Sequence, residues 1–179
     1  MLLILAAGIL TAQLPLYAQD NDGGGEKIKR EYRKIKLGMN SEKVKKLLNE
    51  DSWFNYRGEP DITMLERPGG SLIDAGGSLF IKRGLFQFEE DKLIAITLEL
   101  NPETVDWYTV YTSLENKYGE PADMSPERVW WEDKKTRLSL ERPLTVKYLD
   151  MEYFSKVEQD KKDRQSWREN ARKEFLDEF

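Results

Sequence analysis

The chain of 179 residues contains no cysteine and no histidine. Without cysteine it cannot form a disulfide, present a thiolate nucleophile, or hold an iron–sulfur cluster or a sulfur-ligated zinc. Without histidine, the Ser-His-Asp and Cys-His arrangements of nucleophilic catalysis are excluded, and so are the usual histidine-containing zinc and copper sites. Carboxylate, lysine or tyrosine chemistry remains open, but no clustered polar signature marks a site for it. We therefore expect no catalytic residues, no metal and no cofactor.

Long hydrophobic runs are also scarce, and the clearest one lies at the N-terminus. Residues 1–16 carry no charge, and Leu2 to Leu10 form a nine-residue apolar run. A membrane-spanning helix needs roughly 20 apolar residues, so the run is too short to span. Polar residues and three glycines follow Ala18, which predicts a signal peptide over residues 1–18. No Lys or Arg precedes the run, and a short buried helix is the alternative. We expect an exported, periplasmic chain that is soluble and not lipid-anchored.

Charge is unevenly distributed along a chain whose formal net charge is −5. Residues 26–46 hold nine basic and three acidic residues, and we interpret residues 19–36 as a basic linker segment. The stretch from Lys27 to Lys46 is either a solvated surface or a contact for anionic lipid or an acidic protein face. Because the whole chain is acidic, with a pI near 5.1, no nucleic-acid partner is expected.

An internal repeat organises the middle of the chain. Residues 40–44, NSEKV, reappear 61 residues later as residues 101–105, NPETV. At the same offset, GEP at residues 58–60 matches GEP at residues 119–121. Two sets of matches in one register indicate a tandem duplication. We divide the chain into a first unit over residues 37–100 and a second over residues 101–154.

Each unit is predicted to open with a helix and continue as antiparallel strands. Asn40 or Ser41 caps the first helix, and Asn101 caps the second, which ends at Gly119. Alternating apolar residues then predict a hairpin that turns at residues 89–92 and further strands near residues 79–82, 129–131, 138–140 and 144–153. We interpret the glycine pairs at 69–70 and 76–77 as turns. The fold class is α+β: tandem helix-plus-antiparallel-meander units sharing a sheet.

Residues 155–179 are predicted to form a long charged helix with a narrow apolar stripe. Trp167, Phe175 and Phe179 lie on that stripe, which either docks on the domain, the commoner outcome, or binds a partner. Trp130 is the fourth candidate binding residue. Its neighbour Trp131 must point to the opposite face of a strand, so one tryptophan is in the core and the other is covered by the terminal helix or by something else.

One segment resembles a known family. Residues 37–48, LGMNSEKVKKLL, are similar to the opening signature of the SmpA/OmlA family, the BamE-like periplasmic domains: Gly-Met, a capping residue, then Val and Leu on one helix face. The tandem arrangement is similar to that of the β-lactamase inhibitory protein, whose two related units form one curved sheet that binds another protein. The resemblance implies a small periplasmic adaptor without catalytic residues.

We therefore expect a non-enzymatic binding or scaffold protein of the bacterial cell envelope that interacts with another envelope protein. One alternative is a component of a periplasmic motor or flagellar assembly. The other is a small envelope glycan hydrolase that works through paired carboxylates. Its symmetric candidates, Glu59 and Glu120, each lie in a Gly-Glu-Pro turn, where surface exposure is the simpler explanation.

Overall fold

The computed structural model describes residues 27–56 and 70–179. The predicted signal peptide and the first Gly-Glu-Pro turn lie outside the described residues. The described helices are α1 (Ser41–Glu50), α2 (Trp107–Tyr118) and α3 (Met151–Asp177). The strands are β1 (Glu31–Tyr32), β2 (Ile35–Lys36), β3 (Phe54–Asn55), β4 (Gly70–Gly77), β5 (Ile81–Glu89), β6 (Lys92–Leu100), β7 (Asp123–Met124), β8 (Arg128–Glu132), β9 (Thr136–Glu141) and β10 (Thr145–Asp150). The predicted α+β class is confirmed.

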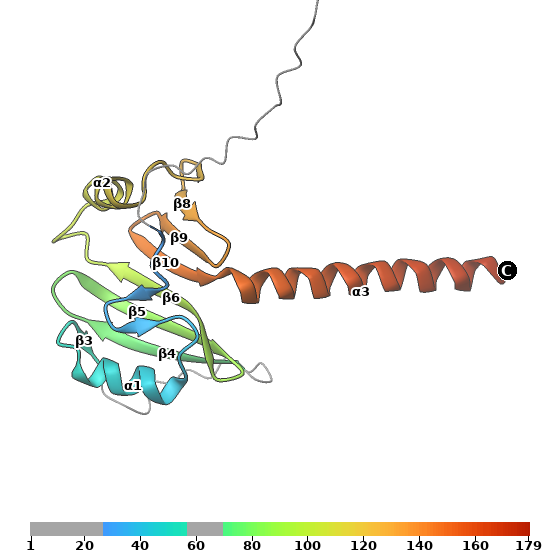
Figure 1. Ribbon diagram of the computed structural model, residues 1–179, viewed down its shortest axis with the longest axis horizontal. Helices are drawn as coiled ribbons and strands as arrows, with labels where there is room; N and C mark the ends of the chain where they lie inside the picture. The colour runs from blue at the N-terminus through green and yellow to red at the C-terminus, as the bar shows by residue number, and fades with distance from the viewer. Residues whose placement is uncertain (1–26, 57–69) are drawn as a thin grey trace, which may run out of the picture.

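One antiparallel sheet of eight strands runs through the described part of the chain, in the order β3-β4-β5-β6-β10-β9-β8-β7. It consists of two meanders that meet where β6 pairs with β10, with Leu98 opposite Val146 and Ile96 opposite Tyr148 (Figure 1). Within the described residues, each half supplies a helix followed by four strands, α1 with β3–β6 and α2 with β7–β10. The order of elements therefore repeats in the two halves, and both halves share one sheet.

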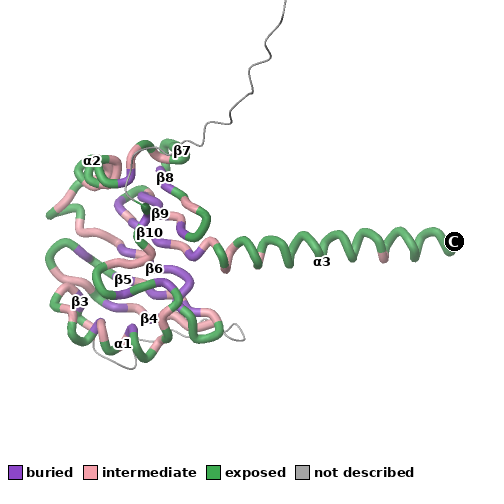
Figure 2. Tube along the Cα trace, viewed as in Figure 1, coloured by how far each residue is buried: buried purple, intermediate pink, exposed green. Residues whose placement is uncertain are grey.

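The hydrophobic core lies on one face of this sheet. Alternate residues of each strand point to that face, so cross-strand neighbours such as Phe86, Ile96, Tyr148 and Leu138 form a continuous buried row. The face is covered by α1, by the hairpin β1–β2 and by α2. Tyr32 of the hairpin contacts Phe54 and Tyr148, with ring centroids 6.4 and 6.5 Å apart. Figure 2 shows the buried residues concentrated along the strands.

Residues 27–36 are part of the folded body rather than a linker. Ile28 and Ile35 are buried in the core despite the basic residues around them. The adjoining chain is bonded to β6, because Gly38 donates its N–H to the carbonyl of Leu93 (2.8 Å) and Leu93 donates to the carbonyl of Met39 (2.8 Å). The lysines of this segment point outward while its few apolar residues point inward. The interpretation of residues 19–36 as a basic linker, which rested on net charge, is therefore wrong for the described part of that segment.

One of the two predicted helix starts is confirmed. Asn40 caps α1, and its side chain accepts a hydrogen bond from the first turn at 3.0 Å. The prediction for Asn101 is wrong, because α2 begins later, with Asp106 as its cap. Asn101 instead holds a turn: its amide donates to the carbonyl of Leu79 (3.1 Å). At the other end, Gly119 has φ 80° and ends α2 as predicted.

Gly70, Gly76 and Gly77 lie in strand β4 instead of forming turns, whereas Gly69 lies outside the described residues. β4 extends from Gly70 to Gly77, and the strand expected near residues 79–82 begins at Ile81 as the start of β5. Gly77 is required by close packing, because a Cβ atom there would lie 2.2 Å from the carbonyl oxygen of Ile81. The predicted turn at residues 89–92 is confirmed, with φ 48° at Glu90 and 56° at Asp91.

Candidate partner-binding surfaces

The base of α3 is fixed to the body by a half-buried ion pair. Asp150, which is 9 % exposed, caps the helix and accepts hydrogen bonds from the N–H groups of Glu152 (3.1 Å) and Tyr153 (3.3 Å). Its other carboxylate oxygen lies 2.6 Å from Nη2 of Arg30 in the N-terminal segment. Because of this cap, the helix starts at Met151, and the strand predicted to continue to residue 153 ends at residue 150.

Beyond its first turns α3 leaves the body and projects into solvent (Figure 1). None of its residues is buried, and between residues 158 and 179 every residue except Ala171 is exposed. The expectation that this helix docks on its own domain is therefore wrong. The stretch from residue 158 to residue 166 contains no apolar side chain that docking could bury.

Three of the four sequence-predicted binding residues lie on the projecting part of α3 and just beyond it. The exposed fractions are 70 % for Trp167, 62 % for Phe175 and 93 % for Phe179. The rings of Phe175 and Phe179 contact each other edge to face, with centroids 5.1 Å apart. Burial of a large apolar side chain stabilises by about 1.5–3 kcal/mol, so these residues offer a partner a substantial contribution.

The fourth predicted residue, Trp130, lies on a different surface. Trp131 points into the core and is 2 % exposed, and its indole N–H donates to the carbonyl of Gly119 (2.8 Å). Trp130 therefore points to the opposite face of the sheet, as the alternation of a strand requires. There it lies between two guanidinium groups, with the Arg128 carbon 4.9 Å and the Arg137 carbon 5.7 Å from its ring centre. The structure thus separates Trp130 from the residues at the end of α3.

Trp130 belongs to what we call the open sheet face, the side of the sheet that points away from α1, α2 and the β1–β2 hairpin. The register brings outward side chains of neighbouring strands into rows across this face. One row crosses the six strands from β8 to β4 and consists of Trp130, Ser139, Lys147, Thr97, Leu85 and Asp74. Charges on it are paired across strands: Arg83 with Asp74, Arg137 with Glu132, and Lys147 with Glu141.

These pairs keep the open sheet face close to electrically neutral. The hydrogen bond from Arg83 lowers the pKa of the Asp74 carboxyl, so this carboxylate stays ionised at neutral pH. Half-buried leucines at residues 72, 85 and 149 lie among the charged pairs. Mixed apolar and paired polar side chains around a tryptophan are typical of a protein-binding surface.

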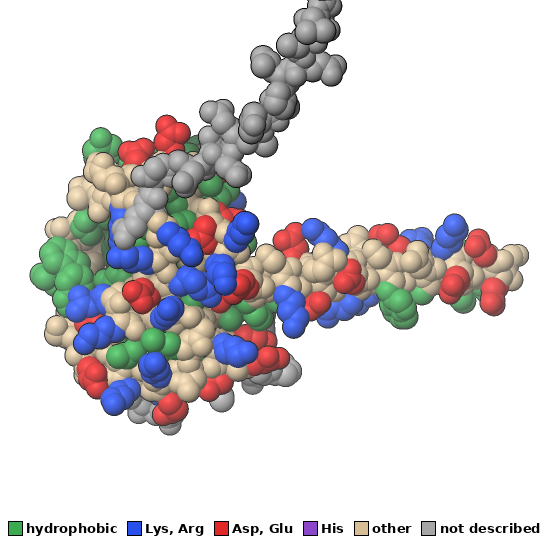
Figure 3. Space-filling model, in the orientation of Figure 1, with side chains coloured by type: hydrophobic (Ala, Val, Ile, Leu, Met, Phe, Trp, Pro, Cys, Tyr) green, Lys and Arg blue, Asp and Glu red, His purple; other side chains and the backbone are tan. Residues whose placement is uncertain are grey.

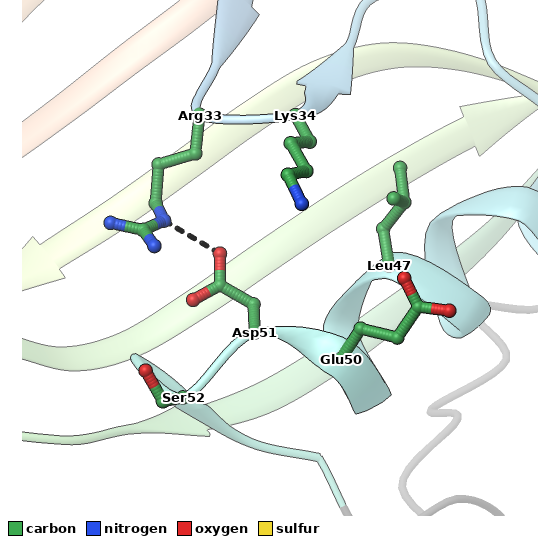
Figure 4. A pocket seen from close by; sticks show the side chains of 6 residues that line it. All are labelled: Arg33, Lys34, Leu47, Glu50, Asp51 and Ser52. Carbon is green, nitrogen blue, oxygen red and sulfur yellow. Dashed lines mark hydrogen bonds and ion pairs between the residues drawn. The ribbon is translucent and has the colours of Figure 1, made fainter.

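The basic stretch from Lys27 to Lys46 forms a third surface. Lysine and arginine side chains gather on the face of the molecule seen in Figure 3. In the turn between β1 and β2, Arg33, at φ 54°, is held by Asp51 through an ion pair of 2.6 Å and lies 4.5 Å from the ring centre of Trp53. The same pair borders a polar pocket of about 370 Å³ between the hairpin and the end of α1 (Figure 4). Its lining residues are Arg33, Lys34, Leu47, Glu50, Asp51 and Ser52.

The sequence analysis missed one exposed apolar turn. Leu79 and Phe80, between β4 and β5, are 65 % and 39 % exposed. Leu79 has φ 56°, an uncommon conformation for a bulky residue, and its carbonyl accepts hydrogen bonds from Asn101 (3.1 Å) and the Thr104 hydroxyl (3.2 Å). The alternation of apolar residues predicts a strand over residues 79–82, but Leu79 and Phe80 precede β5 and form the turn instead.

Within residues 27–56 and 70–179, no three or more aspartate and glutamate side chains lie together in a way that could hold a metal ion. A helix long and apolar enough to cross a membrane is likewise not found in these segments.

Comparison with known proteins assigns the family. No curated protein sequence and no solved structure matches the chain significantly. The resemblance to SmpA/OmlA proteins stays a prediction. A family model described as the TP0088 domain matches residues 30–160, which comprise the sheet, its covering helices and the base of α3. Because the matched residues make up more than half of the chain, the chain belongs to the TP0088 domain family.

Proposed function

We propose that this chain is a non-enzymatic binding or scaffold protein of the bacterial cell envelope, and that it uses α3 to bind another envelope protein. The observation that supports this most directly is the exposure of Trp167, Phe175 and Phe179 on a helix that projects from an otherwise well-packed body. An isolated helix is only marginally stable in water, and a partner that buries these rings would stabilise it.

The open sheet face is the second part of the proposed interface. It carries Trp130 between two arginines and a set of charged pairs that are already neutralised within the chain. A partner that covers this face therefore buries few uncompensated charges, which keeps the desolvation cost low. The two surfaces are separate, so one chain can hold two partners or two parts of one partner, as a scaffold does.

The envelope location comes from the predicted signal peptide over residues 1–18. Export to the periplasm with cleavage after Ala18 would leave a mature N-terminus at Gln19. Mass spectrometry of the native protein tests this step, and an intact Met1 in a cytosolic fraction would contradict it.

Truncation after Phe154 tests the role of α3. The full chain and the truncated chain are each expressed in the native host, crosslinked mildly and recovered from the envelope fraction. We expect the same melting temperature for both, because residues 155–179 contribute no buried residue, and the loss of the main crosslinked adduct from the truncated chain. A truncated chain that keeps every adduct would refute the proposed role of the helix. One that unfolds would show that the helix supports the body instead.

A further inference from the structure

We propose that α3 docks along one defined line of side chains, the α3 seam, into a groove of its partner protein that has carboxylates at its centre and apolar pockets at both ends. This inference rests on the proposed function and specifies the chemistry of the partner. Of the three exposed rings, Phe175 lies on the line, Phe179 follows it by four residues, and Trp167 lies on its flank. The α3 seam consists of Phe154, Val157, Lys161, Arg164, Arg168, Ala171 and Phe175.

The spacing of these residues defines the seam. Successive members are three or four residues apart in alternation, which is the heptad pattern that keeps side chains on one line facing a partner helix or groove. The two ends of the line are apolar, whereas its three central positions are cationic. From Phe154 to Phe175 the seam is about 30 Å long at 1.5 Å per residue, so the complementary groove has a similar length.

The charges of α3 are segregated around its axis, although the helix as a whole carries seven basic and seven acidic residues. At 100° per residue, Arg172 falls beside the seam and adds a fourth cation to the same side. None of the seven acidic residues lies on the seam. Asp160 falls beside it, on the flank opposite Arg172. The other six lie farther round the helix: Glu152, Glu158, Asp163, Glu169, Glu174 and Asp177.

None of the three central seam cations forms an ion pair within the described part of the chain, although Arg164 donates through Nε to the backbone carbonyl of Asp160 (3.1 Å). The ion pair found within the projecting part of α3 joins Lys162 to Glu158, on the other side of the helix, at 3.2 Å. Lys161, Arg164 and Arg168 are exposed and line one shallow groove together. Like charges three and four residues apart destabilise a helix, and a partner carboxylate would remove that repulsion. Charge complementarity thus identifies an acidic partner.

Two other occupants fit the seam less well. A second copy would place cations opposite cations in a parallel pair, and an antiparallel pair centred on Arg164 would bring Lys161 against Arg168. An anionic membrane is disfavoured because a surface helix places its basic residues on the polar side, whereas here they interrupt the apolar line. No apolar residue of the seam lies between Val157 and Ala171, so there is no continuous face to insert.

The chemistry is tested with two synthetic helical probe peptides. In both peptides, leucine occupies the outer positions of a heptad line that faces the two apolar ends of the seam. One peptide has glutamate, and the other has lysine, at the three central positions of that line. Binding to the full chain is followed by fluorescence anisotropy of the labelled peptide. We expect the glutamate peptide to bind at least tenfold more tightly, with an advantage that falls as salt is raised. Equal binding of the two peptides, or tighter binding to vesicles of phosphatidylcholine and phosphatidylglycerol (3:1), would overturn the proposal.

Charge reversal separates the seam from the rest of the helix. R164E/R168E should reverse the peptide preference, whereas K162E/K173E, an equal change of charge on the opposite side, should not. Circular dichroism checks that both variants keep their helix. In the native crosslinking experiment R164E/R168E should lose the adduct and K162E/K173E should retain it. If truncation after Phe154 removes the adduct but R164E/R168E does not, the proposed function holds and the α3 seam is wrong. If truncation leaves the adduct, the proposed function itself fails.

Discussion

The adjacent residues Trp130 and Trp131 provide a direct test of the assignment of the two sheet faces. They have the same chemistry and neighbouring positions in β8, but Trp131 is 2 % exposed whereas Trp130 lies on the open sheet face. Replacement of each by alanine in a separate variant therefore changes the same side chain in two environments. The difference between their effects on the free energy of unfolding reports the environment alone.

The expected magnitudes differ several-fold. Trp131→Ala leaves a cavity against Tyr111, whose ring centre lies 6.1 Å away, and removes the hydrogen-bond donor to the Gly119 carbonyl. Trp-to-Ala changes in cores cost about 3–5 kcal/mol. Trp130→Ala removes two contacts with arginine, each worth about 0.5–1 kcal/mol at an exposed site. It leaves no cavity in the core, because the Trp130 side chain lies on the open sheet face. We expect Trp130→Ala to cost about 1–2 kcal/mol at most.

Urea unfolding followed by far-ultraviolet circular dichroism measures both values without relying on tryptophan fluorescence, which the substitutions themselves alter. If Trp131→Ala does not fold, Trp131→Phe keeps most of the apolar volume and should still cost about 1–3 kcal/mol through the unpaired carbonyl and the smaller ring. Equal destabilisation by the alanine variants, or a larger effect at Trp130, would refute the assignment of the core to the face that contains Trp131.

Three further predictions follow from local geometry. Gly77→Ala should lower stability by about 1–3 kcal/mol because its Cβ would meet the Ile81 carbonyl, whereas Gly76→Ala should have little effect, and thermal melting compares the two. The Thr109 hydroxyl and N–H donate hydrogen bonds to the Asp106 carboxylate and lower its pKa. The stabilising effect of Asp106 is therefore complete above the ordinary value of 3.8 and is lost as the pH falls through the lower folded value. Asp106→Asn should therefore flatten the acid-induced loss of the urea midpoint below about pH 4, and an unchanged acid profile would contradict this. Asp150→Ala should destabilise the base of α3 and reduce its helix signal, because it removes the cap and the Arg30 ion pair together, whereas Asp163→Ala on the projecting part should not.

Local patterns in the sequence were sufficient for most of the secondary structure. Alternation identified β5, β6, β9 and β10 because one face of each strand is buried and the other is not. Asn40 and Gly119 act through short-range backbone chemistry, which is visible in a few residues. The start of α2 was misplaced because Asn101 and Asp106 are both good caps. Only the contact of Asn101 with the distant Leu79 carbonyl decides between them.

Long-range features could not be predicted in the same way. The pairing of β6 with β10 joins segments about fifty residues apart, and no local pattern specifies it. Residues 19–36 were interpreted as a linker because the three buried or half-buried apolar residues in their described part, Ile28, Tyr32 and Ile35, are hidden among lysines and arginines. The apolar stripe of the C-terminal segment identified Trp167, Phe175 and Phe179 from the sequence. Strand alternation identified the fourth candidate, Trp130. Whether these four residues share one surface depends on the direction in which α3 leaves the body. The sequence of α3 does not determine that direction.

Because α3 is separate from the body, the effects of substitutions on binding and on stability can be distinguished in the helix more easily than in the sheet. The buried side chains of the described residues lie in the sheet, in the turn between β9 and β10, in α1, in the end of α2 and in the N-terminal segment, and none lies in α3. Substitutions between residues 158 and 179 should therefore alter binding with little effect on the free energy of unfolding, as for other distant and independent sites. Substitutions on the open sheet face lack this independence, since Trp130 shares a strand with Trp131. A loss of binding caused by a change in α3 can thus be attributed to the helix itself, whereas a loss caused by a change on the sheet must first be corrected for stability.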